Sequence, residues 1–282
     1  MDRPYPRLAA TGLAALIALA VPASAAALDG EGALQRYRPI LHYSSQERYF
    51  AQPVSLPPGS AEVLEGDRVY GHIAREGDDV WLQYWFFYAY NPQDRSPLHT
   101  GRHEGDWELA QLRLGPGGVP DLTTLSQHSW AEGCEWEQLE RRSGAPVLYV
   151  ANGSHAIYSR AGDYDRPFPD PTDEADGEGR EVRPALTPIT DTVPAWVRYD
   201  GRWGDTEAGW VPGESPSPFG PRFQEGGAWT SPSSYHEEQA RTCGSGAPGR
   251  PWQTPLIALA LALLVTLALV RYRASQPIAS RG

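Results

Sequence analysis

Lysine is absent from this chain of 282 residues, so all 24 of its basic residues are arginine. The absence excludes enzymes that form a Schiff base on a lysine side chain. We interpret it as the codon bias of a high-G+C bacterium, which is an inference from composition rather than from physical chemistry.

Cysteine is nearly absent as well, because Cys134 and Cys243 are the only two. Two cysteines without C-x-x-C spacing give poor support to a metal site. In an oxidising compartment such a pair is most simply a disulfide. We therefore predict a Cys134–Cys243 bridge that closes a loop of about 110 residues and stabilises the fold by about 4–5 kcal/mol in the chain-entropy model.

The first long apolar run lies at the start of the chain. Residues 1–25 contain Arg3 and Arg7, then an apolar stretch, then small residues of the A-x-A type. This is the order of elements in a secretory signal peptide, and the stretch is short for a membrane-spanning helix. An uncleaved N-terminal anchor is the alternative.

The second apolar run lies near the other end. Residues 255–270 include fifteen consecutive uncharged residues, and Arg271 and Arg273 follow them. The run covers most of a hydrocarbon core about 30 Å thick, and flanking arginines mark the cytoplasmic side of a membrane. We predict a single transmembrane helix, with 244–254 as a tether and 271–282 as a cytoplasmic tail; a buried core helix is the alternative.

Residues 26–243 then form one domain on the outer side of the plasma membrane, and its charge is strongly negative. Without Asp2 and the five arginines of the end segments, the domain and its tether (residues 26–254) hold 34 acidic residues against 19 arginines, a formal net charge of −15. Such a surface disfavours nucleic acid and favours cations. We expect no nucleic-acid partner and a membrane attachment through the C-terminal helix.

Aromatic residues, glycine and proline are plentiful, with ten Trp, 14 Tyr, 29 Gly and 27 Pro. This composition favours short strands and turns over a helical bundle, so we predict a mainly β domain with a few short helices. Residues 80–90 are aromatic on both faces, which suits a central strand covered on both sides. Further strands are predicted at 107–114 and 146–151, and helices at 32–38 and 135–142.

Residues 162–181 are acidic and rich in proline and glycine. They lack the ligand spacing of an EF-hand loop. We interpret them as a mobile solvated loop, with a loose cation site as the alternative.

The densest cluster of chemically active residues lies at 101–108. In a strand, Asp106 and Glu108 point to one face, while Trp107 and Leu109 point to the other. Two carboxylates about 7 Å apart repel unless a positive group lies between them. His103 or a hard divalent cation would supply that charge. A structural ion-pair network, in which Arg102, Arg113 or another arginine balances the acids, is an equal alternative.

A second cluster, at 152–158, follows the strand predicted at 146–151. Ser154 and His155 do not suggest a catalytic pair, because adjacent residues in an extended chain point apart and no G-x-S-x-G turn is present. We expect His155 to join the first cluster. His128 is a weaker third candidate.

At these clusters the sequence resembles the family related to vacuolar protein sorting-associated protein 62. The matching stretches lie at 37–41, 81–88, 103–108 and 151–158, and a G-x-W-G element lies at 201–204. A more distant resemblance is to the necrosis- and ethylene-inducing-like proteins, in which a G-H-R-H-D-W-E motif on a β-sandwich binds a divalent cation beside a membrane-glycolipid site. This resemblance implies a β-sandwich here and His103, Asp106 and Glu108 as cation ligands. In that motif a histidine directly precedes the aspartate, whereas Glu104 and Gly105 separate His103 from Asp106 in this chain.

Three functions follow as hypotheses. The first is a membrane-anchored outer domain that binds a divalent cation (Ca²⁺ or Mg²⁺) through His103, Asp106, Glu108 and His155, and through it a glycan or lipid headgroup. The second is a metal-assisted extracellular hydrolase with Glu104 or Glu108 as general base. The third is a structural envelope protein without catalytic activity.

Overall fold

The computed structural model describes residues 30–245 apart from 57, 96–99, 168–169 and 206–215, together with Thr266 and Arg271. The predicted signal peptide and cytoplasmic tail, apart from Arg271, lie outside the described residues, as do most of the tether and of the predicted membrane helix. In the part of the chain that is described, no helix has the length and apolar character needed to cross a membrane.

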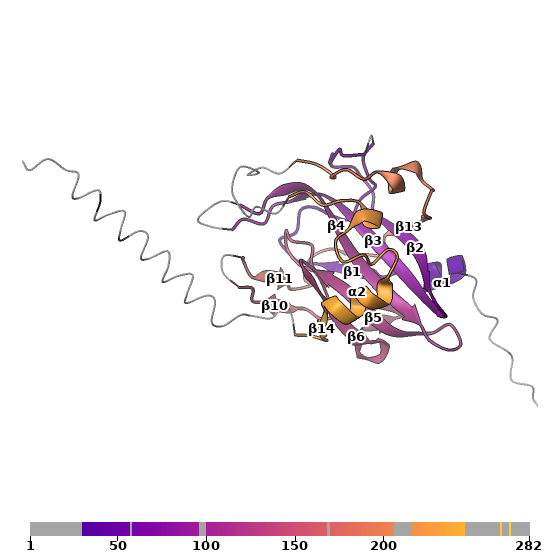
Figure 1. Ribbon diagram of the computed structural model, residues 1–282. Helices are drawn as coiled ribbons and strands as arrows, with labels where there is room; N and C mark the ends of the chain where they lie inside the picture. Colours follow the sequence, from indigo (N-terminus) through magenta and orange to yellow (C-terminus); the bar gives the residue numbers. More distant parts are fainter. Residues whose placement is uncertain are drawn as a thin grey trace, which may run out of the picture.

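The described residues form a mainly β fold with few short helices, as predicted. A seven-stranded sheet is its largest element (Figure 1). Its strands, in spatial order, are β13 (Ala185–Pro188), β2 (Arg68–Glu76), β3 (Asp79–Asn91), β4 (His103–Leu114), β5 (Pro120–Gln127), β6 (Trp130–Glu135) and β14 (Ala240–Thr242). Strands β2 to β6 pair antiparallel, whereas β13 and β14 add to the two edges in parallel.

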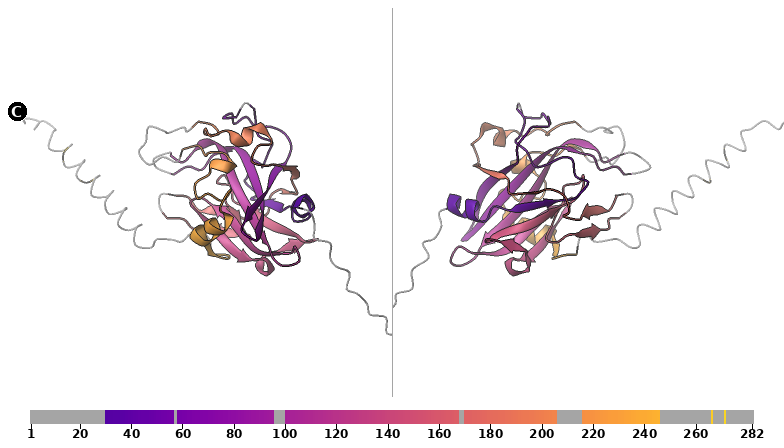
Figure 2. Two further views of the ribbon diagram at one scale, coloured as in Figure 1. Left: turned by 45° about the vertical axis from the view of Figure 1, so that its right-hand side comes forward. Right: turned by 180° about the vertical axis from the view of Figure 1, so that it is seen from behind.

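A smaller sheet has the order β12-β1-β8-β7, with β9 also paired to β8. Its strands are β12 (Glu181–Val182), β1 (Ile40–Tyr43), β8 (Ala145–Val150), β7 (Arg141–Arg142) and β9 (Ile157–Tyr158). A separate hairpin pairs β10 (Gly162–Tyr164) with β11 (Asp173–Ala175), and Figure 2 shows it beside the smaller sheet from two further sides. The helical segments are α1 (Gly30–Arg36), η1 (Trp136–Gln138), η2 (Ala195–Arg198), η3 (Pro221–Phe223) and α2 (Pro232–Gln239).

The main core lies between the two sheets. Leu41 and Tyr43 of β1, and Leu148 and Val150 of β8, belong to one buried cluster with alternate residues of the large sheet. The β3 members of this cluster are Leu82, Tyr84, Phe86 and Tyr88, all fully buried. Each such side chain contributes about 1.5–3 kcal/mol on burial, so this face fixes the register of β3.

The opposite face of the large sheet is covered too. Trp85 and Phe87 of β3 belong to a second cluster with Trp107 of β4, and with Trp196 and Trp203 from the segment between β13 and β14. Alternate residues of β3 therefore face two different cores, which confirms the prediction of a central strand covered on both sides. The predicted strands at 107–114 and 146–151 correspond to β4 and β8, and the helix predicted at 32–38 corresponds to α1.

The helix predicted at 135–142 is wrong. The chain there forms the short turn η1 and then β7, which pairs with β8. The side chain of Gln138 accepts a hydrogen bond from the backbone N–H of Glu135 at 2.8 Å, so it caps a single turn. Pairing with β8 then outweighs the helical propensity of this short segment.

The solvated loop predicted at 162–181 is also wrong in part. The hairpin β10–β11 lies within it, and Asp173 at the start of β11 is fully buried. Partners from distant parts of the chain hold this carboxylate, and they are described with the site below.

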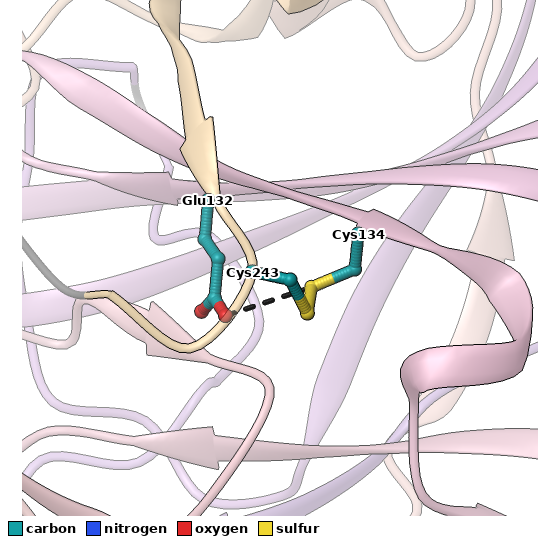
Figure 3. A group of neighbouring side chains, drawn as sticks. All are labelled: Glu132, Cys134 and Cys243. Atoms are coloured by element: carbon teal, nitrogen blue, oxygen red, sulfur yellow. Dashed lines mark hydrogen bonds between the residues drawn. A yellow bond between two sulfur atoms is a disulfide. The ribbon is translucent and has the colours of Figure 1, made fainter.

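The predicted disulfide is confirmed. Cys134 in β6 and Cys243, directly after β14, are bonded across a sequence separation of 109 residues (Figure 3). Glu132 lies beside the bridge, and its carboxylate accepts a hydrogen bond from the backbone N–H of Gly244. The end of the described domain is thus attached to β6 by a covalent bond and by a partly buried hydrogen bond.

Candidate functional site

The site lies where β4 separates from β5. The two strands pair only from Ala110 onward, so the first half of β4, beginning at His103, is paired in the sheet to β3 alone. A cavity of about 710 Å³, here called the β4 cavity, runs along this part of the strand. His103, Asp106 and Glu108 all line it.

Gly105 sets the path of the strand at this point. Its φ is +65°, and a Cβ atom there would lie 1.6 Å from the backbone oxygen of Trp203. No other residue fits, because the conformation is left-handed and the neighbour is backbone. The G-x-W-G element, which contains Trp203, therefore packs directly on the His103–Glu108 segment.

Asp106 and Glu108 lie on the face of β4 that also carries Ala110 and Leu112, which belong to the core between the sheets. Trp107 and Leu109 lie on the opposite face, in the second core. The alternation predicted from the sequence is therefore the alternation observed. It places two carboxylates side by side in a largely buried environment, since Asp106 and Glu108 are 7% and 6% exposed.

Asp106 is held by three hydrogen bonds. Its Oδ2 accepts from Asn91 Nδ2 and from His155 Nδ1, both at 2.9 Å, and its Oδ1 accepts from the backbone N–H of Trp107 at 3.0 Å. Burial alone would raise the pKa of the Asp106 carboxyl, but the hydrogen bond from His155 and nearby positive charge lower it. Asp106 is thus an ionised carboxylate in a fixed orientation.

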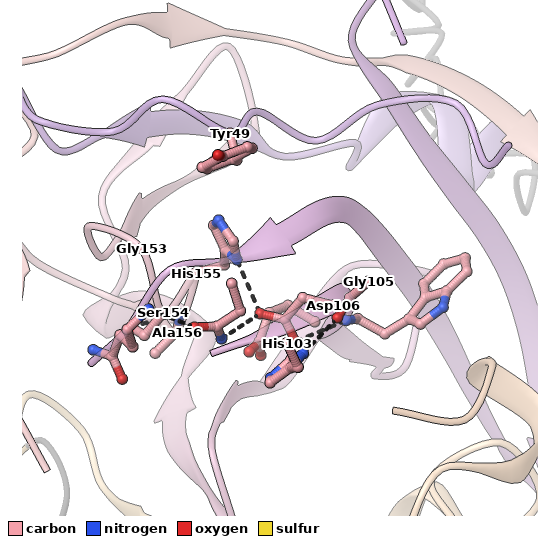
Figure 4. A network of polar contacts seen from close by, with 12 residues as sticks. Tyr49, His103, Gly105, Asp106, Gly153, Ser154, His155 and Ala156 are labelled. Carbon is pink, nitrogen blue, oxygen red and sulfur yellow. Dashed lines mark hydrogen bonds and ion pairs between the residues drawn. The ribbon is translucent and has the colours of Figure 1, made fainter. Parts of the chain in front are cut away.

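His155 lies between the carboxylates of Asp106 and Glu47, and Figure 4 shows its contact with Asp106. Its Nδ1 contacts Asp106, and its Nε2 faces Glu47 Oε1 at 3.7 Å. The ring is fully buried and stacks on Tyr88 with a centroid distance of 3.9 Å. Burial would lower the pKa of this imidazole, but the charges of Glu47 and Asp106 outweigh burial and raise it to about 9. His155 is consequently an imidazolium that balances Asp106, and in that form both nitrogens carry protons.

Glu47 was not singled out by the sequence. Its carboxylate accepts hydrogen bonds from the backbone N–H groups of Arg48 and Tyr49, both at 2.7 Å, and from that of Gly153 at 2.6 Å. Burial would raise the pKa of Glu47, but the charge of His155 and these hydrogen bonds lower it. Glu47 therefore fixes the chain that carries His155.

Glu108 has a different environment. Its Oε2 accepts a hydrogen bond from Ser126 Oγ, and that hydroxyl oxygen in turn accepts from the backbone N–H of Leu109 at 2.7 Å. Burial and the charge of Asp106 raise the pKa of Glu108 well above its ordinary value. A cation placed between the two carboxylates would instead lower the pKa of Glu108.

His103 presents a nitrogen that can bind a metal. Its Nδ1 lies 2.7 Å from the carbonyl oxygen of Gly105, which can only accept, so Nδ1 carries the proton. The lone pair is then on Nε2. A histidine ligand held by a backbone carbonyl through its other nitrogen is common at metal sites.

Asp173 holds two residues that line the β4 cavity, His128 and Ser154. Its carboxylate accepts from His128 Nε2 at 2.7 Å, from Ser154 Oγ at 2.7 Å and from Tyr158 OH at 2.6 Å. Burial would raise the pKa of Asp173, but His128 and the hydrogen bonds lower it. His128 lines the cavity with φ of +58°, a conformation seldom adopted away from turns and functional sites.

Two arginines near this site have their ion-pair partners elsewhere. Arg113 pairs with Asp121, at 2.9 Å and 3.1 Å. Within the described residues no arginine forms an ion pair with Asp106 or Glu108. Among the cavity-lining arginines, Arg166 pairs instead with Asp170 and Asp173.

Among the described residues, one group of three potential ligand atoms lies within 4.8 Å of one another, and it is Glu132, Cys134 and Cys243 (Figure 3). The two sulfur atoms are joined in the disulfide and are not thiolates, which are the form that binds metals. Glu104, predicted as a possible base, is exposed and its Oε2 accepts from the backbone N–H of Asp205 at 3.2 Å.

No family model matches the chain. A relative from Saccharomyces cerevisiae, the putative vacuolar protein sorting-associated protein TDA6, is 24% identical over 170 residues, which are 45% of this chain and 36% of the relative. The chain thus spans about a third of that relative's length.

Among solved structures, the non-toxic HaNLP3 protein is similar with a TM-score of 0.38 and 15% identity over 60% of this chain and 78% of that one. NLPPya in complex with glucosamine is similar with a TM-score of 0.37 and 13% identity over 60% and 74%. The match to the yeast protein confirms the resemblance to vacuolar protein sorting-associated proteins that the sequence predicts.

Proposed function

We propose that this chain binds a divalent cation, Ca²⁺ or Mg²⁺, in the β4 cavity, with Asp106, Glu108 and His103 as its protein ligands. The observation that carries the proposal is the pair of buried carboxylates, Asp106 and Glu108, on one face of β4. Both line the β4 cavity, and within the described residues neither forms an ion pair with an arginine. Hard divalent cations prefer such oxygen ligands and keep some of their waters.

In this proposal His155 acts beside the ligands rather than as one of them. Its two nitrogens face Asp106 and Glu47, so its role is to orient and charge-balance Asp106. Carboxylate ligands of metal ions are commonly held by such hydrogen bonds. A neighbouring glycan or lipid headgroup would then complete the coordination through its own oxygen atoms.

We further propose that the domain carries this site outside the cytoplasm and is held on a membrane by residues 255–270. The apolar composition of that segment and the arginines after it support this placement. A Cys134–Cys243 disulfide is compatible with an oxidising compartment.

Titration of the protein with Ca²⁺, Mg²⁺ and Mn²⁺ by calorimetry is expected to show one site. Binding should release protons wherever the Glu108 carboxyl is protonated, because the cation displaces that proton, and the raised pKa of Glu108 extends this pH range upward. The apparent affinity should therefore rise with pH, and the measured heat should depend on the ionisation enthalpy of the buffer.

Glu108→Gln is expected to weaken the affinity by about a hundredfold, because it removes a charged ligand. Glu104→Gln is the matched control, since Glu104 is four residues before Glu108 but is exposed and outside the cavity lining. Equal affinities for the two variants, or no binding heat for any of the three ions, would refute the proposal.

A metal-assisted hydrolase is the second candidate, and the Asp173–His128 pair favours it. A buried carboxylate that holds one imidazole nitrogen leaves the other able to accept a proton, and His128 lines the same cavity as Glu108. Turnover of chromogenic esters or glycosides that disappears in His128→Asn would support hydrolysis. Turnover that persists in that variant would exclude His128 as the base.

A further inference from the structure

A second cavity, of about 460 Å³, is lined by Glu47 and its neighbours in the chain. Its walls come from four parts of the chain: the segment after β1, which includes Tyr49; the turn at Asn152-Gly153; the segment after β3; and residues 171–174. In the view of Figure 4, His155 lies between Tyr49 and Asp106. We call this space the Tyr49 cavity.

The walls of the Tyr49 cavity are fixed before any ligand arrives. The Glu47 carboxylate binds the backbone of Arg48, Tyr49 and Gly153, and so ties two of the wall segments together. Gly153 has φ of +69°, and a Cβ atom there would lie 3.0 Å from Pro92 in the third wall segment. A pre-formed concave site loses little entropy when a ligand orders it, and such sites are where ligands bind.

The chemistry of the lining points to a neutral, hydroxyl-rich ligand. The side-chain amides of Gln46 and Asn152 line the cavity and form no hydrogen bond within the described residues. Each amide offers both donors and an acceptor, the combination that adjacent hydroxyl groups require. Tyr49 is half-buried, and its ring contacts Tyr90 at a centroid distance of 5.4 Å.

The charges of the lining argue against an anionic ligand. Asp94 and Glu174 contribute carboxylates and Arg48 contributes one guanidinium. Glu47 is balanced by His155 and by the backbone N–H groups that it accepts from. A phosphate or carboxylate would meet more negative than positive groups here.

We propose that the Tyr49 cavity is a second ligand site, for one ring of a neutral saccharide, and that it works without a bound cation. The ring would lie against Tyr49, and its hydroxyl groups would bind the amides of Gln46 and Asn152. None of His103, Asp106 and Glu108 lines this cavity, so its ligand does not need the ion proposed for the β4 cavity.

Saturation-transfer NMR on the full chain, in a sugar-free detergent and with EDTA present, tests this directly. The probes are the methyl glycosides of glucose, mannose and galactose at up to about 50 mM, well above a Kd of about 1 mM. At least one is expected to receive saturation. Tyr49→Ala is expected to weaken its binding by about tenfold, and so is Gln46→Ala, whose side chain is exposed and whose loss leaves the packing intact.

Tyr164→Ala is the matched control, because Tyr164 is also half-buried and lines neither cavity. Thermal melting shows whether each variant is folded. If Tyr49→Ala does not fold, the Gln46→Ala variant alone tests the proposal. Absence of transfer to all three glycosides overturns the proposal. So does transfer that EDTA or Glu108→Gln abolishes while Gln46→Ala leaves it unchanged, which would place the saccharide in the β4 cavity.

Discussion

Replacing His155 by alanine is expected to lower the free energy of unfolding by about 3–5 kcal/mol. The change removes the imidazolium between Asp106 and Glu47 and leaves two buried carboxylates without their shared counter-charge. It also removes a ring stacked on Tyr88. Urea-induced unfolding at pH 7, followed by tryptophan fluorescence, measures the loss.

The pH dependence of the free energy of unfolding separates the contribution of the His155 charge from that of its packing. The folded-state pKa of His155, about 9, is above the unfolded value of about 6.5, so its contribution is fully present below about pH 6.5 and is lost as the pH rises through about 9. Wild type should therefore lose stability over this interval, and His155→Gln should lose much less. His42→Ala is the control, since its partner Glu181 is half exposed and such pairs contribute at most about 1 kcal/mol. Similar losses for His155→Ala and His42→Ala would contradict the imidazolium assignment.

Removing the disulfide by Cys134→Ser with Cys243→Ser is expected to cost about 4–5 kcal/mol, because the bridge closes a loop of 109 residues. For a domain of this size the loss corresponds to a fall in Tm of about 10–15 °C. Differential scanning calorimetry measures it. The chain after β14 should also become susceptible to proteases, because its remaining attachments there are the short pairing with β6 and the hydrogen bond to Glu132.

Chemical reduction of the wild-type protein is the control for the disulfide prediction. A dithiol reductant should lower the Tm of wild type to that of the double variant and leave the variant unchanged. A wild-type Tm that does not respond to complete reduction, confirmed by thiol titration, would show that the bridge contributes little.

The strands at the centre of the fold were predictable because their patterns are local. Residues 80–90 are aromatic on both faces, and the two cores that cover them follow from that pattern. The orientation of Asp106 and Glu108 followed from strand alternation alone. The helix expected at 135–142 failed because pairing of β7 with β8 is a contact that sequence periodicity does not reveal.

The residues around the carboxylates were harder to predict. Glu47 and Asp173 lie in segments that read as ordinary polar loops, yet both are buried and bind partners far away in the chain. Asp173 was counted among the solvated acids of 162–181, because its partners His128, Ser154 and Tyr158 come from other elements. A buried charge is recognisable only when its counter-charge is known.

A crystal structure grown with Ca²⁺ and another with Mn²⁺, each with an anomalous difference map, test the central claim most directly. The account predicts one ion in the β4 cavity, with oxygen atoms of Asp106 and Glu108 within about 2.6 Å of Ca²⁺. His103 Nε2 should point toward the ion, while His155 remains between Asp106 and Glu47. An empty β4 cavity at saturating cation, or an ion held elsewhere without Asp106 and Glu108, would contradict it.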